Sequence, residues 1–418
     1  MHLPQKDNSS LTSRLKNGFT LIEVMVVVLI IAIIAALAMI SYTSVRVKSR
    51  DIRRVSDVNT LHTALNAYYK DHGEYPAIIT PGQIFRNSTN TKTYLDEIPF
   101  NPEPRTDHNC PDSEFIYKVS TDKQSYSLSA CVGADGDPNK GKLIYSTKEG
   151  IFHCGDTITD RDGFTYKTVS IGSQCWMADS LKTRTRPDGS CINFSMSTYI
   201  TPTTHIYTVG DAPGCSITYN GTLTNLGGFA RNSLTHSPRD CISPTSNAQG
   251  TEADCQNGYT LYTWHGAMND PSLTLGMSTG TIAEYPRQGI CPDGWHIPTS
   301  DDFTSLERSV CTSTTCQTDF PFNLTTTGTL GTNESTKLII GGNSNFNAAR
   351  IGMRSSDATP TTPPTYQKNP PNDNSFFWSA AFNGISNLAG RRYVSASGGV
   401  NRNYTFRNRG YEVRCVKD

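Results

Sequence analysis

The chain places a single carboxylate, that of Glu23, at the start of its longest apolar run. Residues 24–40 follow without a charge, and residues 19–22 extend the run toward the N-terminus. As a helix, this stretch would be about 30 Å long, enough to cross the apolar core of a bilayer. A carboxylate in such surroundings is costly unless a positive group lies close to it. Glu23 is therefore expected to have a specific partner.

The twelve cysteines are the second group of side chains that could do chemistry, and ten of them lie beyond Gly150. A zinc site is not expected, because no C-x-x-C pair occurs and neither His265 nor His296 has a partner at the spacing of zinc ligands. The even number predicts paired disulfides in an oxidising compartment, and it disfavours a catalytic thiol.

Oxygen-bearing side chains at alternate positions, Asp135, Asp137 and Asn139, are typical of a calcium loop. The bidentate acid that should follow at a fixed distance is missing, since Glu149 lies too far along the chain. A solvated turn is the preferred interpretation and calcium is the alternative. No other cofactor is expected.

The histidines and the net charge argue against two further classes of protein. No histidine stands beside a nucleophile with motif support, and surface or hydrogen-bonded structural positions are expected for His153, His205, His236, His265 and His296. The 37 basic and 37 acidic residues cancel, so no basic excess is available to bind nucleic acid. We expect neither an enzyme nor a nucleic-acid-binding protein.

A helix is predicted to continue beyond the apolar run, over residues 41–72. Apolar residues recur there at helical spacing and form one stripe: Val55, Val58, Leu61, Leu65 and Tyr68. Gly73 is expected to end the helix.

A small antiparallel β head is predicted for residues 73–150. Residues 114–119 and 124–130 alternate as two strands of a hairpin. Cys110 and Cys131 bracket this hairpin, so we expect a disulfide between them.

The N-terminus resembles the class III leader of type IV prepilins and related pseudopilins. Their pattern is a polar, basic leader followed by Gly, Phe, Thr, Leu, an apolar residue and Glu, and this chain matches it from Gly18 to Glu23. Residues 1–18 would be the leader, and residues 19–72 the transmembrane and assembly helix. Many such helices carry a Pro about twenty residues after the Phe, whereas residues 38–41 contain none. The helix is therefore expected to be continuous or to bend elsewhere.

The resemblance implies a defined maturation. A prepilin peptidase would cut between Gly18 and Phe19 and methylate the new amine of Phe19. The subunit would then leave the inner membrane and pack its helix against copies of itself and related pilins in a filament core. Glu23 would pair there with the Phe19 amine of its own or a neighbouring subunit, and the pilus would stand on the cell surface.

Residues 160–182 and several later motifs resemble the Fib-succ-major paralogous domain. The later motifs follow in the order of that family: Cys291 to Thr299, Asp301 to Glu307, Phe346 to Ala348, Gly352 to Arg354, Phe377 to Ser379 and Tyr411 to Cys415. Ser180 stands where the family usually has Asn. The family is similar to the C-type lectin-like fold. The resemblance implies an α+β surface domain, rich in loops and disulfides, over residues 151–418, with an insertion at about 183–290.

Cysteine pairs can be suggested within this domain. Cys291 and Cys415 open and close its second half, and we expect them to pair. Nearest neighbours give the simplest pairing for the rest: Cys154 with Cys175, Cys191 with Cys215, Cys241 with Cys255, and Cys311 with Cys316. Connectivity does not follow from sequence alone.

The leading interpretation is a type IV pilin or pilin-like subunit. Its helix would serve assembly, and its large C-terminal domain would be displayed for adhesion to a surface glycan or protein. Two alternatives stay open: a pseudopilin of a type II secretion system, because residues 64–76 resemble the helix end of major pseudopilins, and a surface enzyme, because the lectin-like fold also hosts enzymes.

Overall fold

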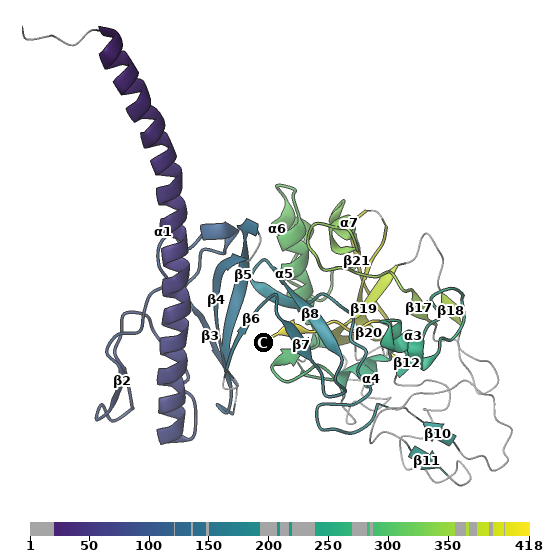
Figure 1. The fold of residues 1–418 in the computed structure, drawn as a ribbon. Helices are drawn as coiled ribbons and strands as arrows, with labels where there is room; N and C mark the ends of the chain where they lie inside the picture. Colours follow the sequence, from purple (N-terminus) through teal and green to yellow (C-terminus); the bar gives the residue numbers. More distant parts are fainter. Residues whose placement is uncertain are drawn as a thin grey trace, which may run out of the picture. The chain divides into compact units, whose positions relative to one another are not determined.

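The structure is a computed structural model. It describes residues 21–120, 122–134, 137–147, 150–192, 207–209, 217–219, 239–269, 282–284, 287–355, 365–367, 374–383, 388–396 and 398–418. The chain divides into two compact units, Met1–Arg53 and Arg54–Asp418. Figure 1 shows their helices and strands.

One helix, α1, extends without a break from Leu21 to His72 (Figure 1). It ends at Gly73, which has a positive φ of 69° and donates its N–H to the carbonyl oxygen of Tyr69 at 2.7 Å. In the first unit, the apolar side chains between Leu21 and Ile33 are exposed.

Among the residues that the structure describes, no helix combines the length and apolar character that a membrane span requires.

In the second unit, the end of α1 packs on an antiparallel sheet with the strand order β3-β4-β5-β6. These strands are β3 (Ile116–Val119), β4 (Tyr126–Ala134), β5 (Asp137–Thr147) and β6 (Gly150–His153). The predicted stripe on α1 is buried or half-buried, with Val58, Leu61 and Leu65 packed among Leu128 and Ile144 of the sheet. The predicted hairpin is confirmed as β3 and β4.

Loops between α1 and this sheet are held by a buried arginine. Arg54 donates to Asn101 Oδ1 at 3.0 Å and pairs with Asp107 at 3.1 Å. The short elements of this region are β1 (Phe85–Arg86), β2 (Thr93–Leu95) and the 3-10 helix η1 (Asp107–Asn109).

Two five-stranded sheets organise the rest of the second unit, and the fold as a whole is α+β. The first has the order β15-β22-β9-β8-β7: β15 (Trp295–His296), β22 (Val416–Lys417), β9 (Gln174–Met177), β8 (Thr165–Ile171) and β7 (Thr157–Thr159). The second has the order β14-β19-β20-β21-β16: β14 (Ile282–Glu284), β19 (Ser375–Asn383), β20 (Leu388–Val394), β21 (Val400–Phe406) and β16 (Gly328–Leu330).

Helix α5 (Ser300–Val310) joins the two sheets. Its residues Phe303 and Leu306 lie in one buried cluster with Trp176 of β9 and Phe377 of β19. The remaining elements are short: β10 (Tyr207–Val209), β11 (Ile217–Tyr219), β12 (Arg239–Cys241), α3 (Glu252–Gln256), β13 (Thr260–Tyr262), α4 (Trp264–Met268), α6 (Cys316–Asp319), α7 (Glu334–Leu338), β17 (Met353–Arg354) and β18 (Tyr366–Gln367).

Part of the expected insertion at residues 183–290 contributes to the core of the second unit. Tyr262 and Trp264 are fully buried and belong to the largest apolar cluster. The indole N–H of Trp264 donates to the Ser379 carbonyl oxygen at 2.9 Å. Residues 239–268 therefore help to build the domain rather than decorate it.

The head sheet and the C-terminal domain share a core. Tyr145 of β5 lies in the same buried cluster as Met177 and Trp295, and Lys417 Nζ lies 5.7 Å from the Tyr145 ring centroid. The Ser127 hydroxyl donates to the backbone oxygen of Asp418 at 2.7 Å. The head sheet also continues into β6, beyond the boundary expected at residues 150/151.

Candidate functional site

The residues predicted to direct maturation lie at the beginning of the chain. Gly18 and Phe19 fall outside the described residues, and Glu23 lies in the first turn of α1, where its side chain is exposed. Exposed apolar side chains surround it, among them Leu21, Ile22 and Met25. A carboxylate in such a surface would be buried with them once the surface is covered, and would then need a positive partner.

The disulfides bring distant parts of the chain together. The structure contains five of the pairs expected from the sequence: Cys110–Cys131, Cys154–Cys175, Cys241–Cys255, Cys291–Cys415 and Cys311–Cys316. Cys191 is also disulfide-bonded, and its expected partner Cys215 lies outside the described residues. The Cys291–Cys415 bridge fastens the strand β22 region to the loop before β15.

The structure describes only part of the segment that could form a calcium loop. Asp137 and Asn139 lie within β5, whereas Asp135 lies outside the described residues. A regular strand at two of the three positions differs from the loop that an EF-hand-like site requires. Calcium binding here stays a prediction.

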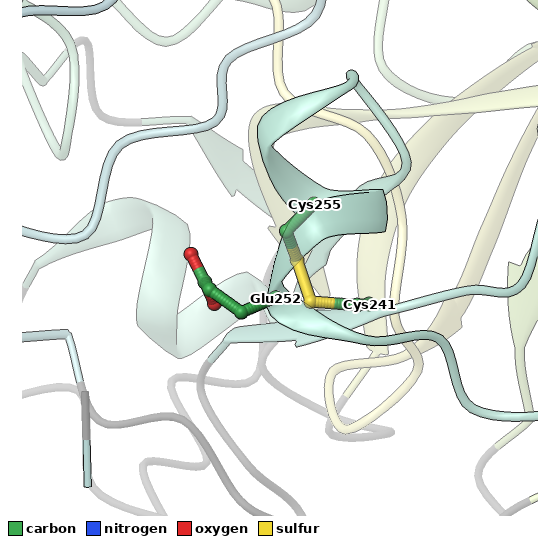
Figure 2. A group of neighbouring side chains, drawn as sticks. All are labelled: Cys241, Glu252 and Cys255. Atoms are coloured by element: carbon green, nitrogen blue, oxygen red, sulfur yellow. A yellow bond between two sulfur atoms is a disulfide. The ribbon is translucent and has the colours of Figure 1, made fainter. Parts of the chain in front are cut away.

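One group of side chains has the ligand types of a metal site: Cys241, Glu252 and Cys255. Figure 2 shows the two sulfur atoms bonded to each other beside Glu252. Glu252 is engaged by Arg239, whose Nη1 lies 2.8 Å from Oε2. Oxidised sulfurs do not act as thiolate ligands, so this group is a disulfide next to an ion pair.

Buried ion pairs dominate the polar interior of the C-terminal domain. Glu307 of α5 accepts from Arg392 Nε at 2.9 Å and from Arg402 Nη2 at 2.8 Å. Arg354 Nη1 lies 3.1 Å from Asp240 Oδ2. All five side chains are almost completely buried, so these pairs fix how the sheet and its covering segments fit together.

His296 bridges two carboxylates across the start of α5. Its Nδ1 lies 2.7 Å from Asp418 Oδ1, and its Nε2 lies 3.1 Å from Asp302 Oδ2. Asp302 also completes a capping box with Thr299, the residue before α5. Burial alone would lower the pKa of His296, but the hydrogen bonds and charges of Asp302 and Asp418 raise it to about 9.

We expect the free energy of unfolding to fall as the pH rises from 6.5 to about 9. In that interval folded His296 retains a proton that the unfolded chain has lost, so its stabilising contribution is complete below pH 6.5 and disappears above about 9. Urea denaturation at several pH values measures this slope. The variant His296→Gln should show a flatter slope, and an unchanged slope would contradict the bridge.

His265 differs from the expected surface or hydrogen-bonded position. Both of its ring nitrogens are buried and have no hydrogen-bond partner. Burial, followed by the positive charge of Arg407, lowers its pKa to about 4. Arg407 itself packs against Trp264, with Cζ 5.0 Å from the ring centroid.

Sequence reasoning missed the arginines around this position. Their clustering in the sequence could have indicated them. The stretch from residue 375 to 418 has only two acids, Glu412 and Asp418, although the chain as a whole is neutral. Its arginines are Arg391, Arg392, Arg402, Arg407, Arg409 and Arg414.

Comparison with known proteins agrees with both ends of the chain. A family model described as the Fibrobacter succinogenes major domain (Fib_succ_major) matches residues 169–417, more than half of the chain. A second, described as the prokaryotic N-terminal methylation motif, matches residues 13–39. The expected fusion of these two parts is confirmed. No curated protein and no solved structure matches the chain.

Proposed function

The chain belongs to the Fibrobacter succinogenes major domain family and begins with a prokaryotic N-terminal methylation motif, and on this premise we propose that it is a type IV pilin or pilin-like subunit. The subunit assembles through its N-terminal helix into a surface filament. It displays the C-terminal domain, which we propose to be lectin-like in architecture and adhesive in function.

One observation carries this proposal: the start of α1 exposes an almost uninterrupted apolar surface that contains one acid. Val27 and Ile31 are about as exposed as their neighbours, at 54 % and 60 %. A large apolar surface of this kind is unfavourable in water and normally packs against another molecule or a membrane. Identical helices in a filament core supply one, and the amine of processed Phe19 supplies the positive charge for Glu23. Before assembly, the inner membrane would cover the same surface.

The surroundings of two half-buried histidines in the C-terminal domain favour a display function over catalysis. His296 has both ring nitrogens occupied by carboxylates, and His265 has no nucleophile beside it in the described part of the chain. Neither is arranged as a general base for a serine or cysteine.

A pseudopilin of a type II secretion system is the second candidate, because residues 64–76 resemble the helix end of that group. The size of the displayed part argues for the surface filament, since residues 151–418 form most of the chain. Recovery in filaments sheared from the cell surface supports the pilus. Recovery only in the envelope, together with loss of secretion on deletion, supports the pseudopilus.

Processing is the direct test of the proposal. We expect N-terminal sequencing and intact mass of the filament form to show methylated Phe19, and Gly18→Leu to abolish both processing and filaments, because the peptidase must approach the backbone closely at this glycine. We expect Glu23→Val to be processed but absent from the sheared filament fraction.

The matched control is Glu97→Val, which removes an exposed carboxylate from the head. It should leave processing and filament yield unchanged. A filament subunit that begins at Met1, or normal filament yield from Glu23→Val, would overturn the proposal.

A further inference from the structure

The face of the second five-stranded sheet that lies opposite α5 carries unpaired positive charge. Cross-strand register places Arg391 opposite Trp378 and Asn403, whereas the next residue, Arg392, points the other way and bonds Glu307. Alternation along β21 brings Arg407, just beyond the strand, to the same face as Arg391. Arg407 lies there against Phe382 of β19, with Cζ 5.2 Å from the ring centroid.

Arg407 is exceptional among the buried arginines. In the described part of the chain, the other buried arginines all donate to a carboxylate or to carbonyl oxygens: Arg54, Arg239, Arg354, Arg392, Arg402 and Arg414. Arg407 is 3 % exposed, makes no ion pair with any described residue, and has a buried Nε without a hydrogen-bond partner. A buried guanidinium without an acceptor is costly, so native proteins normally supply one.

A second unpartnered group adjoins the first. The His265 ring lies 5.6 Å from the Trp264 ring, the same indole against which Arg407 packs, and both of its nitrogens lack partners. The residue as a whole is half-buried, whereas both of its ring nitrogens are buried. Arg407 Nε and the His265 ring nitrogens therefore lack hydrogen-bond partners, and both side chains lie beside the Trp264 ring.

The surrounding charges have the same sign. Arg391 has Nε and Nη1 buried without hydrogen-bond partners, and its Cζ lies 5.1 Å from the Tyr393 ring. The neighbouring charge of Arg409 acts together with burial to lower the pKa of Arg391. Neither arginine makes an ion pair with a residue in the described ranges.

We propose that Arg407 and His265 form an anion-binding site, which takes a carboxylate, sulfate or phosphate group of a ligand on the displayed domain. Arg407 supplies a planar pair of N–H donors suited to a two-oxygen acceptor. Neutral His265 supplies one further N–H. Arg391 on the same face, together with Arg409 near it, adds positive potential that draws anions toward the site. Binding of such an anionic group to the C-terminal domain does not require filament assembly.

The test uses the full-length protein in detergent and three probes: sodium sulfate, sodium phosphate and sodium acetate, each against sodium chloride at equal ionic strength. We expect at least one probe to raise the melting temperature in a saturable manner, because a ligand bound only to the folded state stabilises it. The probe that acts identifies the preferred group.

Two variants make the test specific. Arg407→Met should weaken the effective probe by at least about tenfold, and it should not lower the melting temperature without probe, since it removes an uncompensated buried charge. His265→Leu is the second variant, and it decides the question if Arg407→Met fails to fold. Arg86→Met, which removes an exposed arginine of the head, is the matched control and should behave as the wild type.

Three results would overturn the proposal: no saturable effect of any probe on the wild type, an equal effect on Arg407→Met or His265→Leu, or an equal loss in Arg86→Met. The last would show that the probes act through the general charge of the protein. Because none of these measurements involves processing or filaments, failure here is distinguishable from failure of the proposed function.

Discussion

Replacing Glu307 by alanine is expected to lower the free energy of unfolding of the C-terminal domain by about 3–5 kcal/mol. Glu307 is 1 % exposed and accepts from Arg392 and Arg402, which are themselves buried. Its removal leaves two guanidinium groups in the interior without their shared acceptor, between α5 and the sheet. Urea denaturation followed by tryptophan fluorescence measures the loss.

Glu74 provides the matched control. It also pairs with one cation, Lys123, at 3.0 Å, but both side chains are largely exposed. Glu74→Ala should cost only about 0–1 kcal/mol. The triple variant Glu307→Leu/Arg392→Met/Arg402→Met should lose less stability than Glu307→Ala alone, because no charge is then left unpaired. Equal losses for Glu307→Ala and Glu74→Ala would refute the account.

The double variant Cys291→Ala/Cys415→Ala is expected to lose roughly 5 kcal/mol, since in the chain-entropy account the bridge restricts the unfolded chain more when it closes a longer loop. The two cysteines are 124 residues apart in sequence and fully buried. The comparison is Cys311→Ala/Cys316→Ala, whose bridge spans 5 residues and should contribute about 2 kcal/mol.

Denaturant midpoints of the oxidised proteins measure both losses, and mass mapping verifies that the remaining bridges are native. A larger loss from the short bridge than from the long one would contradict this ranking. Reductant should abolish the difference between the wild type and both variants.

Local patterns made much of the fold predictable. The stripe from Val55 to Tyr68 specified the buried face of α1, and Gly73 specified its end, because both depend on neighbouring residues only. Cys110 and Cys131 bracket a hairpin, so their pairing follows once β3 and β4 form. The Thr299 cap of α5 is likewise a signal confined to one turn.

Long-range partners could not be predicted in this way. Arg391 and Arg392 are adjacent and chemically identical. Strand alternation brings Arg392 to Glu307, whereas Arg391 Nε and Nη1 have no hydrogen-bond partner among the described residues. His296 owes its raised pKa to Asp302, 6 residues away, and also to Asp418, 122 residues away. Such outcomes depend on which segments meet in space, and a single sequence does not encode that in its local spacing.

The shared core between the head sheet and the C-terminal domain has a mechanical consequence. Tyr145, Met177 and Trp295 belong to one buried cluster, and the Leu143 N–H bonds the Ser170 hydroxyl at 2.9 Å. A force applied to the C-terminal domain would therefore be transmitted as shear across packed side chains and not through a flexible linker. The load would reach β4 and β5, which pack against the end of α1.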